Sequence, residues 1–565
     1  MYPLFEKYSI LRVYYKYLFG GAMSKKFMFV LGLALSAAQA FGSVYYVATD
    51  GNDGNPGSKS KPFASLNKAN AVVTAGDTVL IRGGVYYLRD TVYVKTYNIS
   101  AGIHLTASGE SDDKRIHYLA YPGERPIFDG TNLLVGGGYD HYDGTIESVE
   151  YTSPIVIEAK YLHLKGFEVR GVPMKHNSNS GIYILYSKHI FLEQIDSHHN
   201  SGPGFFVNDG RANGGGHYFL NCDAHDNYDP YGRQGDGENA DGFGVHYQES
   251  GDTTKFYGCR AWWNSDDGFD FINQEFPVVV KNSYAMGNGY SDYGTKTPPS
   301  GNGYGFKMGE SKTGKGRHAI KYCVAWKNTA SGFYANYTSV GSKWFNNTSY
   351  NNGDRSFNMA STTYDSEGRE TAPVAVLTGD NVHVLKNNIA YPNTLSRIGG
   401  ENASGENNTW NLNLDLTESD FLSVDDPSMT ITGEDLSMIA GALGPRKADG
   451  SLPDVAFLKL KAGSRAIDKG VDVGTPFAGK APDLGAYEYS SSFADSATSI
   501  TMSIGHSAEA WSSLSVFNLQ GRYLGTLRIE RGETFASALQ KKLKNSGAYL
   551  VRCGHNLLRK KVNVK

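Results

Sequence analysis

The chain has few cysteines, no long apolar run and no extended basic stretch. Its four cysteines, in 565 residues, form no CxxC pair and no Cys/His cluster, so we expect no zinc site. The apolar run near the N-terminus is too short to span a bilayer, and we expect no stable membrane span. The net charge is −3 and no broad basic stretch crosses the central region, which argues against nucleic acid as a partner. An acidic ligand therefore has to be bound by a local site.

Proline is also scarce, whereas glycine and aromatic residues are abundant. The chain has 19 prolines, 67 glycines and 13% aromatic residues. This mixture suits many short strands joined by tight turns. The length is sufficient for two or three domains.

The N-terminal region contains a secretory signal that starts late. Lys25-Lys26 form a basic segment, an apolar run follows, and Ala38-Gln39-Ala40 supplies small residues for cleavage. We assign 23–40 as a signal peptide, with the mature chain starting near Phe41 and the protein secreted or held at the cell surface. Residues 1–22 are interpreted as the product of an upstream start codon chosen in error. A buried helix is the alternative for the apolar run.

Short segments repeat one pattern of glycine, apolar, variable and apolar residues. Side chains alternate along a strand, so the two apolar positions point one way and the variable position points the other. If the copies stack, the variable residues form one outward column, in which Asp270 and Lys307 are neighbours. A degenerate further copy is Ser356-Phe-Asn-Met359. The regular copies start at Gly181, Gly204, Gly242, Gly268, Gly305 and Gly332.

A second series, which precedes each glycine copy, closes on an asparagine. These asparagines are 27, 37, 24, 40, 24 and 41 residues apart, from Asn200 to Asn393. Such periods are typical of solenoids. Because asparagine tolerates left-handed turns and can bond its neighbour in a stack, we predict an asparagine ladder at a corner of a right-handed parallel β-helix. The fold class is thus all-β. A propeller is the alternative, but hairpin signals are absent between these strands.

Three cysteines occupy the same place in this second series. Cys222, Cys259 and Cys323 are expected to stack in the interior as thiols, although spacing alone leaves a disulfide open. The fourth cysteine, Cys553, lies in another domain.

Two loops are inserted at one corner of the predicted coil. The offset from asparagine to glycine is four at Asn264, but fifteen at Asn227 and seventeen at Asn288. These long copies flank the Asp270 strand. Insertions into solenoids tend to lie on the functional face, so the two loops should form the walls of a groove over the charged column.

Four aspartates converge in this register. We expect Asp241 to lie beneath Asp267 on the neighbouring coil, with Asp266 and Asp270 close by, because adjacent coils are about 4.8 Å apart. Without a cation such a cluster repels itself. An all-oxygen carboxylate site suits Ca²⁺. The alternative, that Asp-Gly pairs are ordinary turns, fits isolated cases such as Asp129-Gly130.

Lys307 follows Asp270 in the outward column and is a candidate base. Burial and a nearby cation both disfavour a charged amine, and a neutral amine can abstract a proton. Calcium would bind the carboxylate of a uronic acid, Lys307 would take the C5 proton, and the oxygen at C4 would leave, which is β-elimination. A solvated surface lysine is the alternative for Lys307. Hydrolysis by the Asp266-Asp267 pair is less suited, because aspartates that bind a cation are poor general acids.

The assembled motifs resemble family nine of the polysaccharide lyases, the calcium-dependent pectate lyases on a right-handed β-helix. The matching stretches are Asn239-Ala-Asp-Gly-Phe-Gly-Val-His246, Gly258-Cys-Arg-Ala-Trp-Trp-Asn-Ser-Asp-Asp-Gly-Phe-Asp270 and Gly303-Tyr-Gly-Phe-Lys-Met-Gly309. The resemblance covers about 44–488, and we take 41–489 as the catalytic domain. It implies a Brønsted base at Lys307 and calcium ligands at Asp241, Asp266, Asp267 and Asp270.

The resemblance also implies a substrate class. The expected partner is an acidic plant cell-wall polysaccharide, pectin or polygalacturonate, cleaved by a monomeric enzyme. Other lyases of this family act on rhamnogalacturonan, so that polymer stays an alternative, as do a β-helix hydrolase and a non-catalytic, calcium-stabilised carbohydrate-binding protein. Lys312, Lys315 and Arg317 follow the catalytic strand and are candidates for binding further carboxylates, with a solvated loop as the alternative.

The two ends of the catalytic domain have their own signals. Ser65 to Thr74 has the pattern of a short amphipathic helix that covers the open first coil. At the other end, 490–499 has the composition of a linker. Residues 500–565 resemble the small β-sandwich sorting domains of proteins exported by the type IX route, which implies the secretion machinery as a partner. A plain accessory β-domain is the alternative.

Overall fold

The structure is a computed structural model. It describes residues 42–489 except 138–142, 144, 211–212, 233–234, 292–293, 310–314, 366–368, 373–376, 399–402 and 427–440, and it describes the backbone of four C-terminal strands. The predicted signal peptide, the segment before it and the linker lie outside the described residues.

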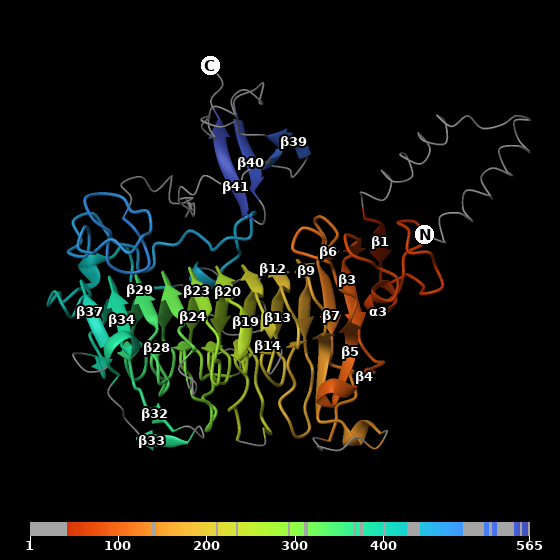
Figure 1. Cartoon of the computed structure of the whole chain (residues 1–565), viewed down its shortest axis with the longest axis horizontal. Helices are drawn as coiled ribbons and strands as arrows, with labels where there is room; N and C mark the ends of the chain where they lie inside the picture. The colour runs from red at the N-terminus through yellow and green to blue at the C-terminus, as the bar shows by residue number, and fades with distance from the viewer. Residues whose placement is uncertain are drawn as a thin grey trace, which may run out of the picture.

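Three long sheets of stacked strands form a parallel β-helix, which confirms the all-β prediction. Figure 1 shows these strands side by side along the long axis, from β1 at one end to β37 at the other. The first sheet contains β1 (Val44–Val47), β2 (Thr78–Ile81), β6 (Ile116–Ala120), β9 (Leu162–Lys165), β12 (Phe191–Glu193), β16 (Tyr218–Leu220), β20 (Thr254–Tyr257), β23 (Val278–Lys281), β26 (Ala319–Lys321), β29 (Lys343–Phe345), β34 (His383–Lys386) and β37 (Ala403–Glu406).

The other two sheets run beside the first. The second contains β3 (Gly84–Tyr87), β7 (Pro126–Asp129), β10 (Glu168–Arg170), β13 (Asp196–His198), β17 (Asp223–His225), β21 (Arg260–Trp262), β24 (Tyr284–Met286), β27 (Val324–Trp326), β30 (Thr348–Tyr350) and β35 (Ile389–Tyr391). The third contains β4 (Val92–Val94), β5 (Ile99–Leu105), β8 (Tyr151–Ile157), β11 (Ile182–Leu185), β14 (Phe205–Asn208), β18 (Phe243–His246), β22 (Phe269–Asp270), β25 (Phe306–Lys307), β28 (Phe333–Tyr334), β31 (Phe357–Asn358) and β36 (Leu395–Ser396). Pairing in the third sheet is parallel from β5 to β36, whereas β4 pairs with β5 in antiparallel fashion.

The remaining elements are short. Two small sheets pair β15 (Asn213–Gly215) with β19 (Ser250–Asp252), and β32 (Thr363–Tyr364) with β33 (Glu370–Ala372). The short helices are α3 (Leu66–Asn70), η2 (Lys95–Tyr97), η3 (Ile146–Ser148), η4 (Gly379–Asn381), η5 (Glu418–Asp420) and η8 (Gly441–Leu443). Within the described part of the chain, no helix has the length and apolar character needed to cross a bilayer.

Helix α3 covers the first coil, as predicted, but it is shorter than the predicted segment. The Ser65 hydroxyl caps it by accepting a hydrogen bond from the Lys68 amide at 3.1 Å. Leu66 and Ala69 are buried against the first coil, so the helix protects apolar residues that no further coil covers.

The C-terminal strands form a sheet of their own. Strands β38 (Leu514–Asn518), β39 (Tyr523–Leu527), β40 (Gly547–Cys553) and β41 (Asn556–Val562) pair antiparallel in the order β39-β38-β40-β41. The sandwich and its sorting role stay predictions, because the described C-terminal residues form this one sheet.

The predicted asparagine ladder is present at the corner between the second and third sheets. Each amide nitrogen Nδ2 donates to the Oδ1 of the next asparagine, at 2.8 to 3.1 Å, through Asn200, Asn227, Asn264, Asn288, Asn328 and Asn352. Asn393 was expected to continue this ladder, and that was wrong. Its Nδ2 instead donates to the Leu414 carbonyl, and its Oδ1 accepts from the Thr409 hydroxyl, although β36 after it still pairs with β31.

The glycines of the repeat lie at the same corner, where a larger residue would not fit. A Cβ on Gly268 would lie 2.7 Å from the Gly305 carbonyl oxygen and 2.8 Å from Asn288 Nδ2. The glycine of one coil therefore leaves the space that the ladder asparagine of the next coil occupies. Inside the coil the apolar positions form a stack of phenylalanine rings with centroids 4.8 to 5.1 Å apart, from Phe205 through Phe243, Phe269, Phe306 and Phe333 to Phe357.

The three cysteines of the repeat are buried free thiols, as we favoured. Their place in the repeat is taken by asparagine in later coils, where a second ladder starts. Asn347 Nδ2 donates to Asn388 Oδ1 at 3.1 Å, and Asn388 Nδ2 donates to Asn408 Oδ1 at 2.8 Å. This second ladder was not predicted.

Candidate active site

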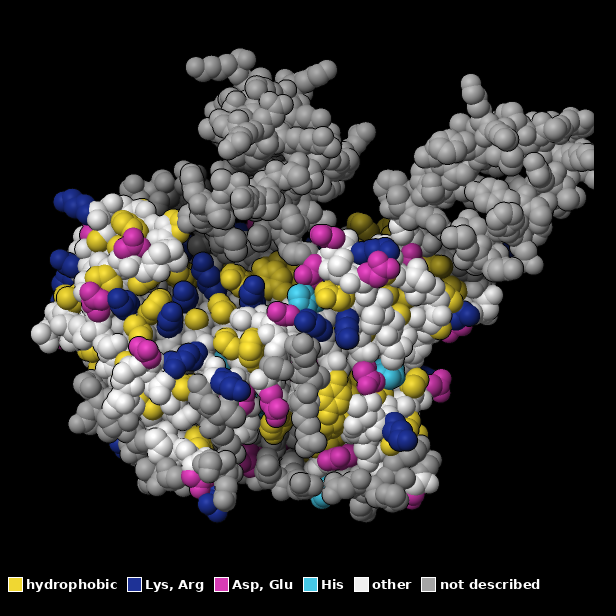
Figure 2. Space-filling model, viewed as in Figure 1, with side chains coloured by type: hydrophobic (Ala, Val, Ile, Leu, Met, Phe, Trp, Pro, Cys, Tyr) yellow, Lys and Arg dark blue, Asp and Glu magenta, His cyan; other side chains and the backbone are white. Residues whose placement is uncertain are grey.

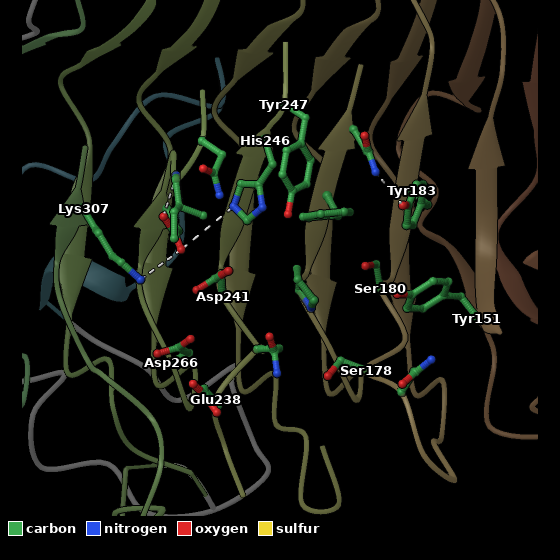
Figure 3. A pocket seen from close by; sticks show the side chains of 18 of the residues that line it. Tyr151, Ser178, Ser180, Tyr183, Glu238, Asp241, His246, Tyr247, Asp266 and Lys307 are labelled. Carbon is green, nitrogen blue, oxygen red and sulfur yellow. Dashed lines mark hydrogen bonds and ion pairs between the residues drawn. The ribbon is translucent and has the colours of Figure 1, made fainter. Parts of the chain in front are cut away.

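A cavity of about 480 Å³ lies over the third sheet. It extends along the coils from Lys307 on β25, past Asp241 and His246, to Tyr151 on β8 (Figure 3). The outward faces of successive strands form its floor. The cavity crosses several neighbouring coils, so its shape suits an elongated ligand.

The two inserted loops enclose one end of this cavity, as the spacing predicts. The amide of Ser300, in the second insert, donates to the Asp236 carbonyl of the first at 3.0 Å. Asp229 anchors the first insert by accepting from the Asn239 amide at 3.1 Å and from the Ser178 hydroxyl at 2.8 Å. The inserts contribute lining residues that were not predicted, among them Glu238, Asn239 and Asn302.

The four predicted aspartates lie together beside this cavity. The Gly242 amide donates to the Asp267 carbonyl at 2.9 Å, so Asp241 and Asp267 occupy equivalent positions on neighbouring coils. The Asp267 amide also donates to Asp241 Oδ1 at 3.1 Å. All four side chains are buried. The register of the repeat thus brings together the four carboxylates that alignment of the repeats placed on two neighbouring coils.

In each of the four aspartates, one carboxylate oxygen accepts a hydrogen bond from a backbone amide. Asp266 Oδ1 accepts from the Asn302 amide at 2.7 Å, and Asp267 Oδ1 accepts from the Tyr304 amide at 2.6 Å. Asp270 Oδ1 accepts from the Ile272 amide at 2.9 Å. With Asp241 Oδ1 also bonded, these contacts orient the side chains and leave the Oδ2 atoms free of backbone bonds.

The aspartate cluster is electrostatically unfavourable in the protein alone. Burial, together with the neighbouring carboxylates, raises the pKa of Asp241 and of Asp266 well above the usual value. Burial also raises the pKa of Asp267, to about 6, although Lys307 opposes the change. Buried, like-charged oxygens of this kind are the donor set that a Ca²⁺ ion prefers. The residues therefore fit a calcium ion.

Lys307 points into the same cluster (Figure 3). Its Nζ lies 2.9 Å from Asp267 Oδ2 and 3.1 Å from Asp270 Oδ2, and the side chain is 10% exposed. Burial alone would lower the pKa of Lys307, but the aspartates, Asp267 and Asp270 foremost, raise it well above the usual value. The sequence predicts a lowered pKa for Lys307, on the assumption that a bound cation offsets the negative charge of the carboxylates. In the protein alone their attraction outweighs the cost of burial.

Aromatic residues line the other end of the cavity. Tyr183 and Phe206, from the predicted outward column, pack edge to face with centroids 5.2 Å apart, and Tyr97 lies 6.2 Å from Tyr183. Tyr151 and Tyr247 complete this set. Tyr97 and Tyr151 lie before the first glycine copy, so the repeat gave no signal for them.

His246 is a further lining residue that sequence reasoning missed. Its Nε2 lies 3.9 Å from Asp270 Oδ2, and its ring packs edge to face on Phe206. Burial lowers its pKa. His246 thus stands as a neutral ring between the aspartate cluster and the aromatic set.

The three basic residues that follow the Lys307 strand were predicted to bind substrate. The described part of the structure does not place them at the cavity. Lys312 lies outside the described residues. Lys315 is exposed and does not line the cavity. The Arg317 guanidinium donates to the Asp380 carbonyl and to Asn381 Oδ1, both at 2.6 Å. A role of these residues in binding substrate stays a prediction.

Comparison with known proteins gives consistent matches to lyases. Pectate lyase L of Dickeya dadantii (strain 3937) is 31% identical over 450 residues, which is 79% of this chain and 90% of that protein. Pectate lyase PEL9 of Emericella nidulans is 27% identical over 432 residues, or 73% of this chain and 91% of that protein.

Two solved structures that match this chain are a pectate lyase and a rhamnogalacturonan lyase. The crystal structure of pectate lyase Pel9A matches with a TM-score of 0.60 at 31% identity, covering 80% of this chain and 97% of that one. A rhamnogalacturonan lyase matches with a TM-score of 0.61 at 30% identity, covering 74% of this chain and 97% of that one.

The family match covers most of the β-helix. Residues 45–388 match the family described as "Pel9A-like, right handed beta helix region", which confirms the predicted handedness. The matches extend over most of the length of these lyases, at 90% of pectate lyase L and 97% of Pel9A. The alternative of a non-catalytic carbohydrate-binding protein is therefore set aside. The chain therefore belongs to the Pel9A-like family of right-handed β-helix proteins, and it is a polysaccharide lyase.

Proposed function

We propose that this lyase cleaves de-esterified galacturonan, polygalacturonate, by calcium-dependent β-elimination with Lys307 as the base. The observation that carries the proposal is the position of Lys307 Nζ, 2.9 Å from Asp267 Oδ2 at the edge of the aspartate cluster. One amine and one cation-binding group of carboxylates thus face the same part of the cavity. The pectate lyases among the relatives support this choice of substrate.

Asp241, Asp266, Asp267 and Asp270 would hold the calcium ion. When bound, the ion supplies a Lewis acid that stabilises negative charge on the uronate carboxyl group. Neutralising the aspartates also removes the attraction that raises the pKa of Lys307 in the protein alone.

Lys307 acts on the sugar whose carboxylate faces the cluster. Its neutral amine takes the proton from C5, and the electron pair of that C–H bond forms the C4–C5 double bond. The C4–O bond breaks, and the departing oxygen takes a proton from water. The products are an unsaturated uronide and a shortened chain. The insert loops and the aromatic set hold the polymer in position for this step.

Rhamnogalacturonan is the second candidate substrate, and one observation favours it. Among the described residues that line the cavity, Lys307 is the one basic side chain, whereas the rest of the lining is aromatic, neutral or acidic. Polygalacturonate carries a carboxylate on every sugar, but rhamnogalacturonan carries one on every second sugar. A lining with few cations suits the lower charge density.

Secretion forms part of the proposal, because pectic polymers lie outside cells. The signal at 23–40 would direct export, and the C-terminal region 500–565 would engage the secretion machinery. The enzyme would act as a monomer in the medium or at the cell surface. Mass spectrometry of the exported protein should find its N-terminus near Phe41 and not at Met1.

An absorbance assay tests the proposal directly. Purified enzyme is given polygalacturonate or rhamnogalacturonan, with calcium or with a chelator, and formation of the unsaturated uronide is followed in the ultraviolet. We expect product on at least one polymer with calcium and none with chelator. Full activity under chelation would contradict the calcium step. New reducing ends without the chromophore would indicate hydrolysis.

A further inference from the structure

A cluster of histidines lies on the second sheet, apart from the cavity. Strand β13 ends in His198 and continues with His199, while the neighbouring strand β17 ends in His225 and continues with Asp226. His198 and His225 are paired in register. His199 and Asp226 both have left-handed backbones, with φ of 52° and 50°. The same two positions of two successive coils therefore supply four polar side chains.

The three histidines lie close together, and Asp226 contacts one of them. His198 Nδ1 lies 2.6 Å from His199 Nδ1, and His225 Nδ1 lies 2.7 Å from Asp226 Oδ2. The rings of His198 and His225 are stacked, with centroids 4.7 Å apart and planes 6° from parallel. The three histidines offer nitrogen atoms that all lie within 4.8 Å of one another. Three imidazoles and a carboxylate are a donor set suited to Zn²⁺.

A second group of carboxylates supports the far side of two of these rings. Glu168 Oε1 lies 3.0 Å from His198 Nε2, and Asp196 Oδ1 lies 3.1 Å from His225 Nε2. Histidines that bind metals usually donate their other ring N–H to a carboxylate, which fixes the tautomer and leaves Nδ1 free as the ligand.

One buried oxygen of the cluster has no hydrogen-bond partner. Asp226 is 8% exposed, and its Oδ1 is buried without a partner in the described structure. A buried carboxylate oxygen without a partner is costly in a folded protein. A metal ion held by Asp226 would remove that cost.

We propose that His198, His199, His225 and Asp226 form a binding site for Zn²⁺ or a similar divalent transition metal. With the three histidines and Asp226 as ligands, the site would be four-coordinate and therefore structural. It joins β13 to β17 across one step of the coil, and none of its residues lines the lyase cavity. The sequence predicts no zinc site, because the four residues form two adjacent pairs that belong to different repeats. They become neighbours only through the register of the coil.

Zinc titration of the full, tag-free chain tests the site. The protein is stripped with chelator, calcium is restored in excess to fill the aspartate cluster, and Zn²⁺ is then titrated by calorimetry. Metal content is measured after desalting. We expect one zinc per chain. Loss of a supporting carboxylate typically costs about 10–100-fold in affinity, so loss of a ligand should cost at least as much.

His199→Ala is the informative variant, because His199 is exposed and its removal spares the core. The matched control is His176→Ala, which removes an exposed histidine outside the cluster. We expect His199→Ala and Asp226→Asn to lose stoichiometric zinc, His176→Ala to keep it, and His199→Ala to retain full lyase activity. Equal zinc binding by His199→Ala and His176→Ala would overturn the proposal. It would also be overturned if the wild type takes up no zinc, which would identify the cluster as a hydrogen-bonded network.

Discussion

Asp270 and Lys307 are directly paired on neighbouring strands of the third sheet, and the Lys307 ammonium lies 3.1 Å from Asp270 Oδ2. Their separation in sequence is 37 residues, so only the stacking of coils makes them neighbours. The pairing places an amine at the edge of a group of buried carboxylates. The proposed chemistry depends on this contact.

Replacing Lys307 with methionine removes the amine and keeps most of the side-chain volume. If Lys307 is the base, kcat falls by about 10²–10⁴-fold. The measurement is the initial rate of unsaturated uronide formation at saturating polymer. Lys343→Met, an exposed lysine on β29, is the control and should retain its rate. A Lys307→Met enzyme as fast as this control would exclude Lys307 as the base.

Asp266→Asn removes one carboxylate from the proposed calcium site. Because affinity for calcium depends on the number of charged ligands, we expect calcium to bind at least about tenfold more weakly. Without calcium the variant should be no less stable than the wild type, since it relieves repulsion among buried carboxylates. Thermal unfolding with calcium and with chelator measures both effects. Asp113→Asn, at an exposed position, should show the wild-type response to calcium.

Two core histidines should make the β-helix sensitive to acid. His318 Nδ1 accepts from the Val278 amide at 3.1 Å, and His383 Nδ1 accepts from the Ser342 amide at 2.9 Å. Burial lowers the pKa of each to about 3. The unfolded chain binds these protons near pH 6.5, so stability is full above that pH and falls as the pH drops toward 3, by up to about 1.4 kcal/mol per pH unit for each histidine.

Variants separate this effect from that of the carboxylates. Urea unfolding is measured at neutral and mildly acidic pH for the wild type, His318→Gln and His176→Gln. His318→Gln should show a smaller loss of stability on acidification, whereas the exposed His176→Gln should follow the wild type. Parallel curves for all three proteins would refute a buried neutral His318.

The asparagine ladder should contribute measurable stability. Asn288→Ala removes the amide that donates to Asn328 Oδ1 at 2.8 Å and accepts from Asn264 Nδ2 at 3.0 Å. Buried partners left unpaired cost about 1–3 kcal/mol each, and we expect a loss of that order in the free energy of unfolding. Asn393→Ala is the matched control, because Asn393 closes a copy of the motif but is exposed and outside the ladder. Equal losses in the two variants would mean that the ladder bonds add nothing.

Tyr247 offers an exposed ring at the cavity, with 44% of the residue accessible. Stacking of a sugar on this ring predicts that Tyr247→Ala raises KM by roughly 2–10-fold while kcat changes little. Steady-state kinetics on both polymers measures this split. Tyr87→Ala removes an exposed tyrosine on β3, outside the cavity, and should leave KM unchanged. An unchanged KM in Tyr247→Ala would remove the ring from the binding surface.

Most of the features that could be predicted from the sequence followed from the repeat. Because each glycine copy occupies the same place in its coil, aligning the copies was enough to place Asp241 beneath Asp267 and Asp270 beside Lys307. The ladder followed from the same alignment. These features depend on local spacing and on the period of the coil, which are both visible in the chain.

Features that depend on contacts outside the repeat could not be predicted. Tyr97 and Tyr151 line the cavity from coils that precede the first regular copy. Arg317 follows the catalytic strand, yet its guanidinium bonds to the turn at Asp380. The raised pKa of Lys307 depends on the balance between burial and four carboxylates, and the order of residues does not give that balance.

The corner of glycines and asparagines also determines how this enzyme can be redesigned. The offset from the ladder asparagine to the following glycine is four at Asn264 but seventeen at Asn288, and both coils keep the same register on either side. The scaffold thus tolerates a complete change of loop length at this one junction. Asp241, Asp266 and Asp267 lie in the segments that follow Asn227 and Asn264, so the segment that follows Asn288 is the one of these three that relatives can exchange without replacing a proposed calcium ligand.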